Sequence, residues 1–187
     1  SIPVPDGVTR IGKHSLENVT SELSMPDSVV EIDSYAFAAS SFNSSKLPAG
    51  LQFIGDYAFQ GTGISSLTMP SGVTHIGEYA FGNCDSLDEI YFNYTVDQVN
   101  SLDSNSISST SFGDNSNLKL IFNDNYAKTA FDTKFPDLSS KTVSQLKITG
   151  LKDTYSLGST EIIQVQSNRP GEVINYTIDN NNVASIN

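Results

Sequence analysis

Four closely similar segments recur along this chain, and each begins with a proline. They read PDGVTRIGKHSL (5–16), PDSVVEIDSYAF (26–37), PAGLQFIGDYAF (48–59) and PSGVTHIGEYAF (70–81), at intervals of 21, 22 and 22 residues. A catalytic motif is needed only once, so a phrase repeated four times indicates architecture. A period near 22 residues lies within the range of leucine-rich repeats, in which one short strand per coil stacks into a parallel ladder.

The apolar residues of the copies fall into three columns, which predict how the coils stack. The columns contain Val8, Val29, Leu51 and Val73, then Ile11, Ile32, Ile54 and Ile76, and finally Leu16, Phe37, Phe59 and Phe81. A single coil cannot bury these side chains, but stacked coils can, and each fully buried one contributes about 1.5–3 kcal/mol. Alanine precedes the phenylalanine where a neighbouring coil leaves little room.

A glycine follows the isoleucine in three of the four copies. Gly12, Gly55 and Gly77 predict a backbone position that is either closely packed or in the φ > 0 region. The second copy has Asp33 there, a residue that tolerates positive φ better than most.

A strand-like phrase precedes each copy, and the last unit is irregular. FGDNSNLKLIF (112–122) repeats the phrase that starts at residue 81, but 31 residues later. The insertion predicts a short helix, because Thr95 and Gln98 have capping-box spacing and Val96, Val99 and Leu102 share a helical face. Segment 124–135 is predicted to complete a cap over the end of the core.

The pattern changes after about residue 136. Segment 138–144 is predicted to be a linker, and beyond it QLKITGL, EIIQVQS and VINYTI are short β-branched phrases separated by turn signals. These phrases favour a separate β domain over 145–187.

Two family resemblances follow from these motifs. Proline, Gly/Ser-Val, Ile-Gly and Tyr-Ala-Phe in register resemble the BspA-like leucine-rich repeats of bacterial surface proteins. Leu157-Gly158 and the phrase at 183–186 resemble the start of a group 2 bacterial immunoglobulin-like domain. The expected fold is therefore a leucine-rich repeat solenoid over 1–137, with about five coils plus a cap, then the linker and a partial immunoglobulin-like β domain over 145–187.

Composition argues against several classes of function. The net charge of −11 disfavours nucleic acid as a partner, and no run of about 20 apolar residues exists to insert into a membrane. Cys84 is the only cysteine, and His14 and His75 are the only histidines. We predict no catalytic residues, no metal, no cofactor and no enzymatic activity. The Asn/Asp runs at 123–125 and 179–182 fit turns better than calcium loops.

The strand residues between apolar anchors are the candidate binding face. They are Glu22, Ser24, Ser44, Lys46, Ser66, Thr68, Glu89, Tyr91 and Lys119. The resemblance implies an extracellular or cell-surface protein that binds a host or neighbouring-cell surface or matrix protein. Two alternatives stay open, a structural stalk without a ligand and a carbohydrate-binding module. The chain has no tryptophan to stack on sugar rings.

Overall fold

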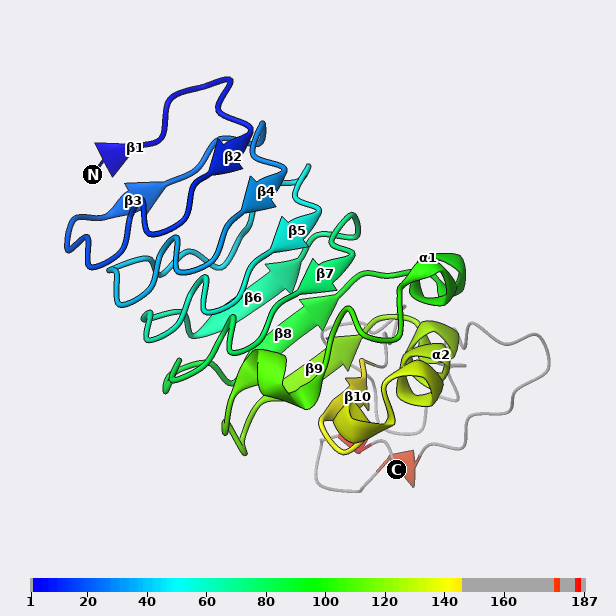
Figure 1. Cartoon of the computed structure of the whole chain (residues 1–187). Helices are drawn as coiled ribbons and strands as arrows, with labels where there is room; N and C mark the ends of the chain where they lie inside the picture. The colour runs from blue at the N-terminus through cyan, green and yellow to red at the C-terminus, as the bar shows by residue number, and fades with distance from the viewer. Residues whose placement is uncertain (1, 146–176, 179–183, 186–187) are drawn as a thin grey trace, which may run out of the picture. The chain divides into compact units, whose positions relative to one another are not determined.

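The structure is a computed structural model that describes residues 2–145, 177–178 and 184–185 (Figure 1). The chain divides into two compact units, residues 1–145 and 146–187. The first unit is a stack of coils with two ladders of short parallel strands, and helices lie at its C-terminal end (Figure 1).

The strands of the first unit are β1 (Ile2–Pro3), β2 (Arg10–Ile11), β3 (Leu23–Ser24), β4 (Glu31–Ile32), β5 (Phe53–Ile54), β6 (Ser66–Met69), β7 (His75–Ile76), β8 (Glu89–Phe92), β9 (Lys119–Phe122) and β10 (Thr142–Ser144). Its helices are α1 (Val96–Ser101), α2 (Asn125–Lys134) and the 3-10 helices η1 (Ser109–Phe112) and η2 (Pro136–Leu138).

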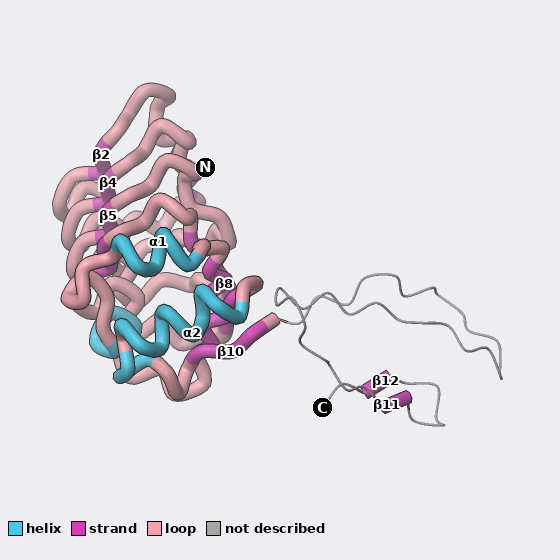
Figure 2. The backbone as a smooth tube through the Cα atoms, turned by 90° about the vertical axis from the view of Figure 1, so that its right-hand side faces the viewer, coloured by secondary structure: helices cyan, strands magenta, loops and turns pink. Residues whose placement is uncertain are grey.

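The strands of the first unit form two four-stranded parallel ladders, and β1 and β3 form a separate parallel pair. One ladder runs β2-β4-β5-β7 and the other β6-β8-β9-β10, all parallel (Figure 2). The proline turn joins them, because the carbonyl of Pro26 accepts a hydrogen bond from the amide of Val29 at 3.2 Å, and the other three copies repeat this bond. The strand pairing confirms the repeat register expected from the sequence.

The predicted columns form the core. Ile32, Ile54 and Phe59 are fully buried. The phenylalanine rings stack nearly parallel, with centroids 5.3 Å apart for Phe37 and Phe59 and 5.4 Å apart for Phe59 and Phe81. The Phe112 ring continues the column, with its centroid 6.2 Å from that of Phe81. The irregular unit therefore rejoins the stack after its insertion.

Left-handed backbone recurs twice per coil, at positions that the sequence analysis did not single out. Tyr35, Tyr57 and Tyr79 have φ of 59°, 58° and 50°, and a second position four residues later is left-handed at Ala39 and Gly61. The tyrosine rings stack, with centroids 4.7 Å apart for the first pair and 5.5 Å for the second. Ring stacking and inter-coil hydrogen bonds hold a conformation that bulky residues rarely adopt.

Two of the three repeat glycines, Gly55 and Gly77, are required for close packing. A Cβ on Gly55 would lie 2.6 Å from the amide nitrogen of Ser34, and one on Gly77 would lie 2.5 Å from that of Asp56. Neither glycine has positive φ, so of the two explanations offered by the sequence, the packing one is correct.

Helices α1 and α2 close the C-terminal end of the core. Helix α1 begins with the predicted capping box, since Thr95 Oγ1 accepts from the Gln98 amide and Gln98 Oε1 accepts from the Thr95 amide. Phe131 of α2 is fully buried and packs with its ring centroid 5.0 Å from that of Phe122. Lys134 Nζ donates to the Leu102 carbonyl at 2.7 Å and so ties α2 to the end of α1.

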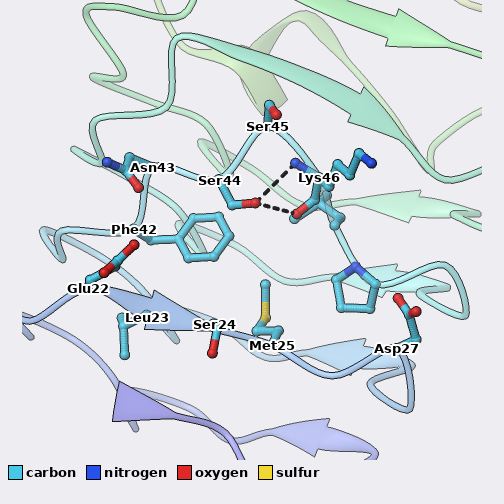
Figure 3. A pocket seen from close by; sticks show the side chains of 12 residues that line it. Glu22, Leu23, Ser24, Met25, Asp27, Phe42, Asn43, Ser44, Ser45 and Lys46 are labelled. Atoms are coloured by element: carbon cyan, nitrogen blue, oxygen red, sulfur yellow. Dashed lines mark hydrogen bonds between the residues drawn. The ribbon is translucent and has the colours of Figure 1, made fainter. Parts of the chain in front are cut away.

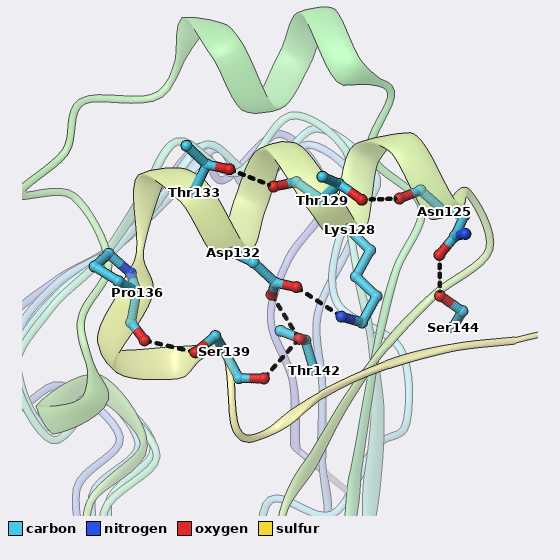
Figure 4. A network of polar contacts seen from close by, with 9 residues as sticks. All are labelled: Asn125, Lys128, Thr129, Asp132, Thr133, Pro136, Ser139, Thr142 and Ser144. Carbon is cyan, nitrogen blue, oxygen red and sulfur yellow. Dashed lines mark hydrogen bonds and ion pairs between the residues drawn. The ribbon is translucent and has the colours of Figure 1, made fainter.

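The end of this unit corrects the linker predicted for 138–144. Leu138 is fully buried and β10 pairs with β9 as the last strand of the ladder. The Asp132 carboxylate binds Lys128 Nζ at 2.6 Å and the Thr142 hydroxyl at 2.5 Å, which fixes β10 against α2 (Figure 4). The serines and Pro136 suggested a linker, but they form η2 and the turn after it.

The second unit shows one described pairing. Strands β11 (Thr177–Ile178) and β12 (Ala184–Ser185) are antiparallel. The rest of the immunoglobulin-like domain predicted over 145–187 lies outside the described residues.

Candidate binding face

The outer side of the β6-β8-β9 ladder carries the predicted face. Successive side chains of a strand point to opposite sides, and in β8 Ile90 and Phe92 are buried while Glu89 and Tyr91 are half-buried on the outside. Strand β6 follows the same alternation.

The strand register arranges the nine predicted residues in two rows. Lys46, Thr68 and Tyr91 are paired in one row, with Ser24 at the corresponding place one coil earlier. Ser66, Glu89 and Lys119 are paired in the other, and Glu22 and Ser44 precede it in earlier coils. All nine are exposed or half-buried.

The most elaborate contact in these rows joins Tyr91 and Glu89. The Tyr91 hydroxyl donates to Glu89 Oε2 at 2.6 Å. This hydrogen bond to a carboxylate is the main cause of a raised pKa for Tyr91, because it favours the protonated phenol. Lys119 lies directly across from Glu89 in the ladder. The face therefore presents an aromatic ring, a carboxylate and an ammonium group on adjacent strands.

Two apolar residues that the sequence did not single out extend the row of Lys46, Thr68 and Tyr91. Ile121 pairs with Tyr91, and Val143 pairs with Ile121. Ile121 is only 8% exposed and Val143 is 37% exposed. The run Leu120-Ile121-Phe122 is apolar throughout and hides the alternation, and Val143 lies in the segment predicted to be a linker. In this row, apolar residues thus take the places on the last two strands that polar residues occupy in the earlier coils.

The ladder opens between β3 and residues 43–47, a place called the ladder gap below. No backbone hydrogen bond joins 22–25 to 43–47 in the described chain, although Lys46 pairs normally with Thr68. The register aligns Ser45 with the buried Leu67 of the next coil. Ser45 is exposed, so segment 43–47 lacks the buried apolar side chain that Leu67 supplies in the next coil.

A depression of about 510 Å³ occupies the ladder gap (Figure 3). Its lining is formed by Glu22, Leu23, Ser24, Met25, Asp27, Phe42, Asn43, Ser44, Ser45, Lys46, Leu47 and Pro48. The Ser44 hydroxyl accepts from the Lys46 amide at 3.2 Å and donates to the Lys46 carbonyl at 2.9 Å (Figure 3). The Ser44 hydroxyl therefore binds the Lys46 amide and carbonyl, which a neighbouring strand would otherwise bind.

The two histidines and the cysteine, the side chains best suited to catalysis, all have structural partners. His14 stacks on Tyr35 at 4.8 Å, and His75 stacks on Phe53 at 4.6 Å. The Cys84 thiol is buried, donates to the Phe59 carbonyl at 3.2 Å and lies 3.4 Å from the Thr62 hydroxyl. Burial raises the pKa of Cys84, which lowers its thiolate content and its reactivity.

The described residues contain neither a metal-binding cluster nor a membrane-spanning helix. No group of three or more His, Cys, Asp and Glu side chains there is placed to hold a metal ion. None of the described helices combines the length and the apolar character that crossing a bilayer requires.

Comparison with known families decides the class of repeat. The model of the BspA type leucine rich repeat region matches residues 1–119 in six copies. The chain belongs to this family. The match ends at the first residue of β9, so the nine predicted face residues and the ladder gap lie within BspA-type repeats, whereas Ile121 and Val143 lie beyond the matched region. The match contains six copies, whereas the sequence predicted about five coils plus a cap.

A crystal structure of a leucine-rich repeat protein from Bacteroides ovatus is similar to this BspA-type chain. The two are 28% identical with a TM-score of 0.45, and the match covers 69% of this chain and 35% of that one. The chain thus spans about a third of the length of that relative. No curated protein matches it.

Proposed function

We propose that this chain is a non-enzymatic binding module of a bacterial cell-surface or secreted protein, and that its ladder face engages a protein partner. Membership of the BspA-type family supports the surface location, since proteins with such repeats are commonly surface proteins. The partner is a protein on a host or neighbouring cell, or in the surrounding matrix.

One observation carries the proposal. Tyr91, Ile121 and Val143 are consecutive in register on three paired strands, and the Tyr91 hydroxyl is oriented by Glu89. Tyrosine is enriched among the residues that contribute most binding energy at protein–protein interfaces, and the buried centre of an interface is more apolar than its rim.

The test is a double substitution on this face. Tyr91→Ala with Glu89→Ala should weaken binding to a partner found on a panel of host matrix proteins, and the melting temperature should change little because both side chains point outward. Gln52→Ala with Glu78→Ala is the matched control, since both residues are exposed away from the β6-β8-β9 ladder. Unchanged affinity would remove this face as the site.

A glycan array run beside the protein panel separates the alternatives. Binding to glycans alone would favour the carbohydrate-binding module, and no binding on either panel would favour the stalk. A sharp drop in melting temperature of the double variant would mean that Tyr91 supports the fold rather than a partner.

We propose further that residues 146–187 begin an immunoglobulin-like β domain. The antiparallel pairing of β11 with β12 supports this, because β12 lies within the phrase at 183–186 that carries the resemblance. Hydrogen exchange on the whole chain should show protected amides at 177–178 and 184–185. Exchange as fast as in a denatured control would contradict the proposal.

A further inference from the structure

The ladder gap leaves one strand edge without a partner. The Val4 amide donates to the Ser24 carbonyl at 3.0 Å, so the Ser24 backbone faces β1. Backbone groups of successive strand residues point to opposite neighbours, and those of Leu23 and Met25 therefore face the gap. An unpaired edge of this kind is a template for pairing with another chain.

The opposite edge of the gap is protected. The amide and carbonyl of Lys46 face the gap, and the Ser44 hydroxyl binds both of them. The two sides of the gap therefore differ, because β3 offers open backbone groups whereas segment 43–47 does not. Any added strand is directed to β3.

The rim of the gap carries unbalanced charge. Glu22 and Asp27 line it from the β3 side, and Lys46 lines it from the other. Asp27 Oδ1 accepts from the Ala49 amide at 3.2 Å, but none of the ion pairs among residues 2–145 involves these three side chains. Two carboxylates against one ammonium group favour a ligand with basic side chains.

We propose that an extended segment of the protein partner enters the ladder gap and adds to the free edge of β3 as a strand. Its apolar side chains replace the anchor that Ser45 lacks, and its basic side chains lie beside Glu22 and Asp27. Strand addition to an exposed edge is an established mode of peptide recognition, in which backbone hydrogen bonds supply affinity and side-chain pockets supply specificity. This inference rests on the proposed function and deepens it by naming the chemistry of the partner.

A glycan fits the gap less well. Its one aromatic lining residue, Phe42, is 1% exposed and already packs between Phe37 and Phe59, with centroids 5.1 Å and 5.3 Å away. The ring therefore offers no free face on which a sugar could stack. The free edge of β3 matches a polypeptide backbone instead.

The probe is the peptide KTVKVTK with a fluorescent label, titrated into the whole chain by anisotropy. Its apolar residues alternate with polar ones, as in a half-buried strand. A version N-methylated at alternate amides keeps the side chains but lacks half of the backbone donors. We expect the N-methylated peptide to bind at least about tenfold more weakly, and equal affinity or no binding of either peptide would overturn the proposal.

The protein variants locate the site. Ser45→Leu restores the missing anchor, so it should close the gap and abolish binding without lowering the melting temperature. Ser86→Leu, at an exposed serine of a turn, is the matched control and should bind like the parent. Retained binding by a folded Ser45→Leu variant would overturn the proposal.

A second variant covers the case in which Ser45→Leu does not fold. Glu22→Gln with Asp27→Asn should weaken KTVKVTK severalfold at low salt while leaving the uncharged TTVTVTT unaffected, and unchanged affinity for KTVKVTK would count against the site. If the gap variants leave peptide binding unchanged while Tyr91→Ala with Glu89→Ala still weakens partner binding, strand addition is rejected but the proposed function is kept. The reverse pattern would assign recognition to the ladder gap alone.

Discussion

The ring of Phe59 lies between those of Phe37 and Phe81, nearly parallel to both, at 5.3 Å and 5.4 Å. It has no exposed surface. Each coil therefore depends on its neighbours for the burial of its largest side chain, as in other repeat proteins, where stability is a sum of coil and interface terms.

Replacing Phe59 by alanine should lower the free energy of unfolding by about 3–5 kcal/mol, because the truncation leaves a cavity shared by three coils. Thermal or denaturant unfolding measures the loss. The exposed Gln52→Ala variant is the control and should unfold like the parent. An equally small effect at both positions would contradict the core register.

Alanine at Gly77 should be strongly unfavourable, because its Cβ would lie 2.4 Å from Asp56 Oδ1 and 2.5 Å from the Asp56 amide nitrogen. The backbone of the preceding coil must shift, and such overpacking destabilises by about 1–3 kcal/mol. The same change at Gly12 meets no atom within 4 Å, so Gly12→Ala should be close to neutral. Similar effects of the two substitutions in urea unfolding would show that packing is not the reason for the repeated glycine.

Glycine at Ala39 should stabilise the fold. Ala39 is exposed and has φ of 52°, and Gly61 occupies the equivalent position one coil later. A non-glycine residue in left-handed geometry is strained by about 1–2 kcal/mol. Glycine removes this strain but loses more backbone entropy on folding, so the net gain in stability is smaller than the strain. Gly61→Ala should destabilise by a comparable amount. A lower melting temperature for Ala39→Gly would contradict the strained geometry.

Stability should fall in acid through Asp33. Its pKa is below the ordinary value of 3.8, first because the Ser34 amide donates to Oδ1 at 2.9 Å and then because the Arg10 guanidinium donates to Oδ2 at 2.8 Å. A lowered folded-state pKa means that folding favours the carboxylate, so this stabilisation is present above about pH 4 and is lost as the pH falls through the folded-state value.

The check is the difference in melting temperature between the parent and Asp33→Asn, measured at pH 6 and near pH 2. The difference should be clear at pH 6 and should shrink at the lower pH. Asp6→Asn, at an exposed residue, serves as the control. A difference that grows on acidification would reverse the assigned sign.

The repeat and its core follow from the sequence because stacked coils place equal positions in contact, so Ile54 and Phe59 could be assigned by spacing alone. Helix α1 was predictable from the local hydrogen bonds of Thr95 and Gln98. The left-handed tyrosines were not predictable, because ring stacking between coils overrides the local preference of Tyr57. Strand β10 was not predicted, since its polar residues Thr142 and Ser144 are stabilised by side chains of α2, Asp132 and Asn125.

Only part of the candidate site could be predicted from the sequence. The period-2 pattern places Tyr91 and Glu89 on the outer side of the ladder, and the structure has them there. The ladder gap arises at Ser45, which resembles any other serine in a polar stretch until the register aligns it with Leu67. A single substitution in a core column is hard to recognise in one sequence, because its effect depends on strands in two other coils.

The tyrosine column gives this chain an optical reporter of its own fold. The protein has no tryptophan, so tyrosine dominates its near-ultraviolet absorption. Tyr35, Tyr57 and Tyr79 are held in a fixed, chiral stack with interplanar angles of 8° and 9°, and rings in fixed tertiary packing give a near-ultraviolet circular dichroism signal that is lost when the packing loosens. The loss of coil-to-coil contact can therefore be followed without a label, separately from the loss of backbone structure.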